Sequence, residues 1–136
     1  MNLFKLAPVF CVFFLGGAAA AVPDIGPVSE VGVGRIGDNV ARYIKTFNDS
    51  CLEVQVISPD KNWEVLSFAN FCKFDGKKFG SDFADAGFED ITVQEDGIHM
   101  ILSVTPLQPT GEQRRHCVVP VVGALIKELS CSEVVK

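Results

Sequence analysis

The sequence predicts an α+β domain with a mostly antiparallel sheet of about five strands, one helix near each end and two disulfides. Three observations lead to this prediction. Residues 88–105 read as two strands joined at Asp96-Gly97, a dipeptide that suits a type I′ turn. Residues 38–47 and 120–129 carry apolar side chains at helical spacing. Four cysteines lie outside residues 1–21, which are expected to be a leader. A mostly-β sandwich is the alternative, in which residues 112–129 contribute more strand than helix.

Residues 1–21 are expected to be a secretory signal peptide. Lys5 precedes an apolar run, and residues 16–21 are small, which fits a cleavage site before Ala21 or Val22. We therefore expect a secreted, extracellular protein whose single domain spans residues 22–136. Without Lys5, the chain has 11 Lys and Arg against 17 Asp and Glu, a formal charge of −6. An acidic chain repels polyphosphates, so no nucleic-acid partner is predicted.

The first helix is expected over residues 38–47, with Asp38 as its N-cap. Val33, Ile36, Val40, Ile44 and Phe47 recur at threes and fours over residues 29–48. A start at Ser29 is the alternative, although Gly32, Gly34 and Gly37 weaken the first half of this region. The following triplet, Asn48-Asp49-Ser50, is an acceptor for N-glycosylation at Asn48 in a eukaryotic host.

Residues 52–58 and 63–71 are expected to pair as a hairpin around the turn residues 59–62. The first of these strands alternates, which places Leu52, Val54 and Val56 inward and Glu53 and Gln55 outward.

The four cysteines outside the leader are Cys51, Cys72, Cys117 and Cys131, an even set that allows three disulfide connectivities. We favour Cys51–Cys72, at one end of the hairpin, and Cys117–Cys131, which would tie the last helix to the preceding strand. The spacing suits no zinc site, so no metal or cofactor is predicted.

Residues 68–88 contain six phenylalanines among lysines and aspartates. One interpretation places these rings in the core of the domain. The other makes part of the segment a binding surface, for which the candidate residues are Phe74, Lys77, Lys78 and Phe79.

In the central hairpin, the Asp96-Gly97 turn would set Val93 opposite Met100 and Phe88 opposite Thr105. The apolar face then consists of Ile91, Val93, Met100 and Leu102. Residues 112–119 should form an edge strand. Pro120 would open the last helix, whose apolar stripe is Val122, Leu125, Ile126 and Leu129.

No catalytic site is predicted, so the protein is expected to act without enzymatic activity. A G-x-S-x-G elbow is absent, and the two histidines, His99 and His116, lie on predicted strands without a nucleophile motif. An acidic cluster before the central hairpin would be the calcium or glycosidase site of a small hydrolase, which we keep as an alternative. Its members are Asp82, Asp85, Glu89 and Asp90.

A leader, a short mature chain and two disulfides from Cys51, Cys72, Cys117 and Cys131 resemble the layout of small secreted effector proteins of plant-pathogenic fungi. The resemblance implies a virulence factor that binds a target protein, such as a host protein, outside the producing cell or inside a host cell. We expect a monomer without stable membrane association. The same layout fits a secreted carrier with a Phe-lined cavity, or a periplasmic inhibitor or immunity-type protein.

Overall fold

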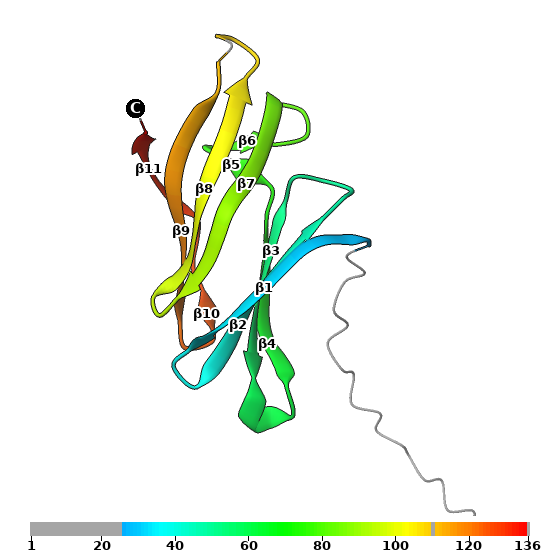
Figure 1. Ribbon diagram of the computed structural model, residues 1–136, viewed down its shortest axis with the longest axis vertical. Coiled ribbons are helices and arrows are strands. Elements are labelled where there is room, and N and C mark those ends of the chain that lie inside the picture. Colours follow the sequence, from blue (N-terminus) through cyan, green and yellow to red (C-terminus); the bar gives the residue numbers. More distant parts are fainter. Residues whose placement is uncertain (1–25, 110, 136) are drawn as a thin grey trace, which may run out of the picture.

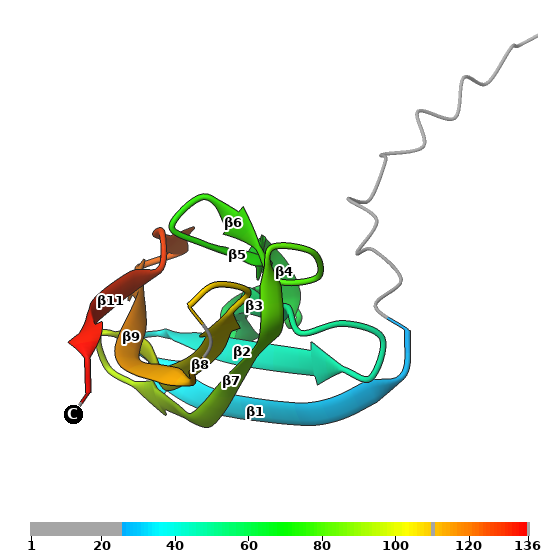
Figure 2. The same cartoon turned by 90° about the horizontal axis from the view of Figure 1, so that it is seen from above.

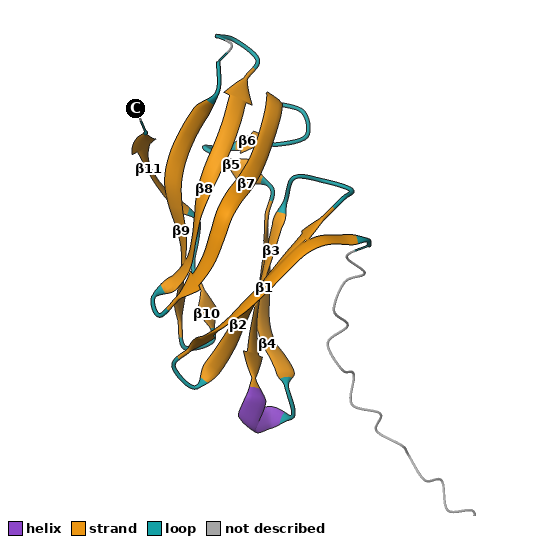
Figure 3. Cartoon of the chain, viewed as in Figure 1, coloured by secondary structure: helices purple, strands orange, loops and turns teal. Residues whose placement is uncertain are grey.

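The computed structural model describes residues 26–109 and 111–135. The predicted signal peptide and its cleavage site lie outside these residues. The described chain contains eleven strands, and its one helical element is the single-turn 3₁₀ segment η1 (Pro59–Lys61) (Figure 3). The α+β prediction is therefore wrong, because the protein is built almost wholly of β-strands.

The first sheet is an antiparallel meander in the order β1-β2-β3-β4. Its strands are β1 (Val28–Ile36), β2 (Asn39–Thr46), β3 (Leu52–Ser58) and β4 (Glu64–Phe71). The hairpin predicted around residues 59–62 is present as β3 and β4, with η1 in its turn. Because each connection is short, consecutive strands are neighbours in the sheet.

The second sheet has the order β10-β9-β8-β7, with β11 paired to β9 on the same side as β10. Its strands are β7 (Phe83–Gln94), β8 (Gly97–Pro106), β9 (Gln113–Val122), β10 (Leu125–Ile126) and β11 (Ser130–Val134). Between the sheets, β5 (Lys73–Phe74) and β6 (Lys77–Lys78) form a short hairpin. Its turn, Asp75-Gly76, has positive φ at both residues (51° and 75°), as a type I′ turn requires.

The two sheets curve around one core and form a half-barrel (Figures 1 and 2). β1 runs along β7 on one side, and β10 contacts β3 and β4 on the other. The largest fully buried side chains come from both sheets: Phe88, Leu52, Ile98 and Leu102. The interior is therefore filled by side chains from both sheets.

The predicted helix over residues 38–47 is strand β2. The residues at helical spacing do not share a buried face, because Ile36 is buried while Val33 and Phe47 are exposed. The strand instead alternates: Ala41 and Tyr43 face the core, whereas Arg42 and Ile44 face outward. Apolar residues on both faces hide the two-residue period and imitate a helical one.

The predicted helix over residues 120–129 is also absent. β9 continues through Pro120 to Val122, Gly123 turns with φ 61°, and β10 runs back along the end of β9. The supposed apolar stripe is split, since Val122 and Leu125 are each 60% exposed. Residues 112–129, to which the mostly-β alternative assigned more strand than helix, contain β9 and β10.

The central hairpin forms in a different register from the one predicted. Its two turn residues are Glu95-Asp96, Val93 pairs with Ile98, and Phe88 pairs with Leu102. The shift at the turn is two residues, which leaves each side chain on its predicted face. A β-bulge between Glu89 and Thr92 then changes the pairing.

Candidate binding surfaces

The side of the β1–β4 sheet away from the core is a second surface, which we call the outer sheet face. The strand register places its residues in three rows that run across all four strands. These rows are Val31-Ile44-Glu53-Asn70, Val33-Arg42-Gln55-Phe68 and Arg35-Val40-Ile57-Val65.

A polar network lies at the centre of this face. The Arg42 guanidinium donates from Nε (3.0 Å) and from Nη2 to Oε1 of Gln55. The Gln55 amide in turn donates to Oε1 of Glu53 over 2.8 Å. Gln55 and Glu53, predicted to point into solvent, do face away from the core, but they are only 1% and 8% exposed. Each buried polar group is paired, which fixes the middle of the outer sheet face.

Large apolar side chains flank this network and remain open to solvent. Val31, Val33 and Phe68 are 56%, 65% and 49% exposed. Scattered exposed apolar residues are ordinary on a protein surface, but here they share one sheet face and rows with the central network.

Trp63, the only tryptophan in the chain, lies at the tip of the β3–β4 hairpin and is 65% exposed. Both Asn62 and Trp63 have positive φ, 55° and 61°. This left-handed backbone is unusual for a bulky residue and costs about 1–3 kcal/mol. The turn thus holds an indole ring in solvent at the end of the sheet that also carries Arg35.

The four residues predicted to form a binding surface do not come together on one. Phe79 is buried (5% exposed), and its ring contacts Phe83 and Phe88 at centroid distances of 6.2 and 5.5 Å. For this ring, the core interpretation of the Phe-rich segment is the one that agrees with the structure. Phe83 and Phe88 are likewise packed in the core.

Phe74 and Lys77 lie beside a small cleft of about 220 Å³ at the β5–β6 hairpin. The Arg115 guanidinium carbon stands 5.2 Å from the centre of the Phe74 ring, a cation–π arrangement. The Nε of Arg115 is a buried donor with no hydrogen-bond partner among the described residues. Lys78 belongs instead to a larger cleft on the other side of the hairpin.

That larger cleft, about 560 Å³, lies beside the Cys51–Cys72 disulfide, and we call it the disulfide cleft. Its lining is Asn48, Asp49, Ser50, Cys51, Cys72, Lys73, Lys78, Phe79, Gly80 and Ser81. Asn48, the predicted glycosylation acceptor, is exposed at this cleft. A glycan attached there would stand at the cleft wall.

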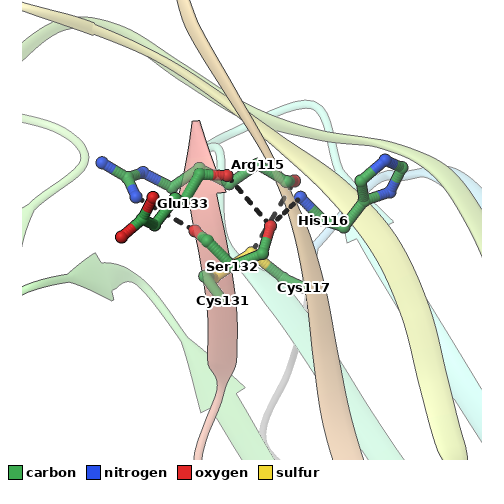
Figure 4. The surroundings of a disulfide bond; sticks show 6 residues. All are labelled: Arg115, His116, Cys117, Cys131, Ser132 and Glu133. Carbon is green, nitrogen blue, oxygen red and sulfur yellow. Dashed lines mark hydrogen bonds between the residues drawn. A yellow bond between two sulfur atoms is a disulfide. The ribbon is translucent and has the colours of Figure 1, made fainter. Parts of the chain in front are cut away.

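Both disulfides have the favoured connectivity, Cys51–Cys72 and Cys117–Cys131. The second joins two directly paired strand residues of β9 and β11 rather than a helix and a strand. Beside it, Ser132 Oγ accepts from the His116 N–H (3.3 Å), and Arg115 Nη1 donates to the Ser132 carbonyl (3.0 Å) (Figure 4). Two disulfides are compatible with an extracellular protein.

Both histidines considered for catalysis lie on the second sheet. His99 Nε2 lies 2.7 Å from Asp96 Oδ1, and this hydrogen bond lowers the pKa of Asp96. His99 and His116 both line a cleft of about 280 Å³ on the second sheet. Within residues 26–109 and 111–135, no three His, Cys, Asp or Glu side chains are grouped to hold a metal ion.

Two carboxylates of the acidic cluster have separate partners in the described chain. Asp82 accepts the Lys78 N–H (2.7 Å), and Glu89 makes an ion pair with Arg114 (2.9 Å). Each of these carboxylates is thus engaged with a different element of the fold.

Comparisons with protein-family models, with curated proteins and with solved structures found no match. Among the described residues, no helix is long and apolar enough to cross a membrane. The assignment of the candidate surfaces therefore rests on their geometry in this structure.

The sequence interpretation missed the outer sheet face and Trp63. A signal for Trp63 was present, because the lone tryptophan directly follows the turn residues Pro59-Asp60-Lys61-Asn62. The outer sheet face had no such signal, since it gathers residues from four strands, one of which was read as a helix.

Proposed function

We propose that this chain is a secreted, disulfide-stabilised, non-enzymatic protein of effector type that acts by binding a target protein. The target docks on the outer sheet face and on Trp63, and it offers a complementary apolar patch. The observation that carries this proposal is the exposed Trp63, held in a left-handed backbone at the end of that face. Strained conformations persist where the surrounding structure imposes them, and they cluster at functional sites.

The composition of the surface supports a protein partner. Tryptophan and arginine are enriched among the residues that dominate binding energy at protein interfaces. Trp63 and Arg35 lie at the same end of the sheet, next to the exposed Val33. The Arg35 side chain is exposed and has no ion pair with another described residue.

The polar network makes the same face rigid before binding. Arg42, Gln55 and Glu53 are already hydrogen-bonded to one another, so a partner need not order them. Surfaces that are ordered in advance lose less conformational entropy on association.

The proposal predicts which variants lose the target. Immobilised protein should capture the target from candidate tissue, and the purified target should then be titrated against each variant. Trp63→Ala is expected to weaken binding by about 2 kcal/mol or more, as for other interface anchors. Val33→Asp should have a comparable effect, because it places a charge in the apolar contact. Neither change should lower the melting temperature appreciably, since both side chains are exposed.

Leu107→Ala is the matched control, because Leu107 is also exposed (55%) but lies in the β8–β9 loop. It should bind as the wild type does. Phe74→Ala and Lys77→Gln test the surface that the sequence suggested. If these two variants lose the target while Trp63→Ala keeps it, the outer sheet face is not the docking surface. In the wild type, the fluorescence of Trp63 should shift to shorter wavelength on binding.

A further inference from the structure

The disulfide cleft has the size of a small-molecule site. Its volume of about 560 Å³ falls in the range typical of ligand pockets. It shares no residue with the outer sheet face, so it requires its own explanation.

Two like charges are placed opposite each other at this cleft. Lys73 on β5 and Lys78 on β6 are direct cross-strand partners. Such a pair destabilises a hairpin unless something neutralises it. In the described structure, neither ammonium group makes an ion pair or a hydrogen bond with a carboxylate.

The nearby carboxylates are engaged elsewhere. Asp49 Oδ1 accepts the backbone N–H of Cys51 (3.0 Å). Asp82 Oδ2 accepts the backbone N–H of Lys78 (2.7 Å), while the Asp82 N–H donates to the Lys78 carbonyl (2.9 Å). These bonds stabilise the loops that frame the cleft and leave both ammonium groups without a counter-ion among residues 26–109 and 111–135.

The remaining lining is partly apolar. The Cys51–Cys72 disulfide and the Phe79 ring contribute surface without charge. A ligand that satisfies the whole cleft must combine an anionic group for the lysines with an apolar body for the disulfide and Phe79.

We propose that the disulfide cleft binds a small organic acid with an apolar body, such as an aromatic or aliphatic carboxylate or sulfonate. Lys73 and Lys78 neutralise the acid group, and the apolar part lies against the disulfide and Phe79. This site is separate from target binding, so the two proposals can fail independently.

The test uses two fluorescent probes with the same ring system. Anilinonaphthalene sulfonate carries the acid group, and N-phenyl-1-naphthylamine lacks it. The folded wild type should bind the sulfonate saturably at one site and more tightly than the neutral amine. Binding of the sulfonate should weaken with added salt, because the attraction is between charges near the surface.

Lys73→Gln with Lys78→Gln is expected to weaken sulfonate binding about tenfold and to leave the neutral amine nearly unchanged. Lys61→Gln is the matched charge control, since Lys61 lies in η1, outside the cleft. Gly80→Trp should block both probes, because a Cβ at Gly80 enters open space beside the cleft. Gly87→Trp, at another glycine with open space around its Cβ, controls for the added ring.

The near-ultraviolet circular dichroism and the melting temperature of each variant establish that it is folded. The proposal is overturned if sulfonate binding is the same in the double lysine variant and the wild type. It is equally overturned if Gly80→Trp binds both probes as Gly87→Trp does, or if the wild type binds neither probe.

Discussion

At the scale of single residues, Gln55 shows how a polar side chain can be buried on an open face. It is 1% exposed, yet Val33 and Phe68 in its own row remain largely exposed. Its amide connects a cation to an anion: the carbonyl oxygen accepts from Arg42, and the NH₂ group donates to Glu53. Removing this amide would leave Glu53, only 8% exposed, without its donor.

Gln55→Ala is therefore expected to lower the free energy of unfolding by about 1–3 kcal/mol, the usual cost of leaving buried polar groups unpaired. Urea denaturation followed by circular dichroism measures this loss. Gln94→Ala is the control, because Gln94 is exposed and bonds only Thr92 on its own strand. A substitution of that kind should change stability by less than about 0.5 kcal/mol. Equal stability of the two variants would show that the network contributes nothing.

At the scale of elements, the β7–β8 hairpin depends on Gly97 for a reason other than its turn. Gly97 is the first residue of β8, pairs with Pro120 of β9 and has φ 151°. A Cβ at this position would run into the Val119 carbonyl and lie 2.9 Å from Cα of Pro120. The glycine thus permits the close approach of two backbones as well as an unusual dihedral angle.

Gly97→Ala should consequently be more destabilising than Gly76→Ala. Gly76 also has positive φ (75°), but a Cβ there meets nothing within 4 Å. Both variants carry backbone strain, and only Gly97→Ala adds a clash with β9, worth about 1–3 kcal/mol more. Thermal unfolding of the two proteins compares them directly. A larger loss in Gly76→Ala would contradict the role assigned to β9.

The same elements show how far the sequence alone could go. The β3–β4 and β7–β8 hairpins were predictable because each pairs alternating strands across a short turn rich in turn-forming residues. Cys51–Cys72 followed from the β3–β4 hairpin and the even cysteine count, whereas Cys117–Cys131 was expected to join a helix to a strand and instead joins β9 to β11. The register of β7–β8 was wrong, because the Asp-Gly signal at residues 96–97 is not used as the turn, while Asp75-Gly76 is.

The β1–β2 hairpin was not predictable from local pattern. Gly32 and Gly34 were read as residues that weaken the start of a helix, whereas they lie on the core side of β1. A Cβ at Gly32 would overlap the Tyr43 ring, and one at Gly34 would lie 2.6 Å from the Val93 Cβ. The reason for these glycines is thus tertiary packing, which no neighbouring residue in the sequence reveals. The outer sheet face was hidden for the same reason.

At the scale of the whole molecule, no disulfide joins the two sheets. Cys51–Cys72 connects the ends of β3 and β4, and Cys117–Cys131 connects β9 to β11. Besides the shared core, a polar seam between β2 and β7 holds the sheets together. Lys45 donates to the Phe88 carbonyl over 2.8 Å, and its Nζ lies 3.6 Å from Glu30.

Tyr43 is the second member of this seam and the only tyrosine in the chain. Its hydroxyl donates to Glu30 (3.0 Å) and lies 3.5 Å from the Ile91 carbonyl oxygen. Burial and then the nearby Glu30 carboxylate raise the pKa of Tyr43 above its ordinary value of 10.0. Ionisation would place a phenolate beside that carboxylate and remove the donated proton.

This raised pKa predicts an alkaline loss of stability. A group whose pKa is higher in the folded state stabilises the fold fully below its unfolded value, here about pH 10, and loses that contribution as pH rises through the folded value. The free energy of unfolding should thus fall above pH 10 in the wild type.

Phenolate absorbance near 295 nm reports Tyr43 alone, and its midpoint in the folded protein should lie above 10 and return to about 10 in urea. Tyr43→Phe keeps the ring but not the proton, so its free energy of unfolding should fall less steeply over the same pH range. Identical alkaline profiles of the two proteins, or a folded midpoint at or below 10, would show that this hydroxyl does not hold the two sheets together.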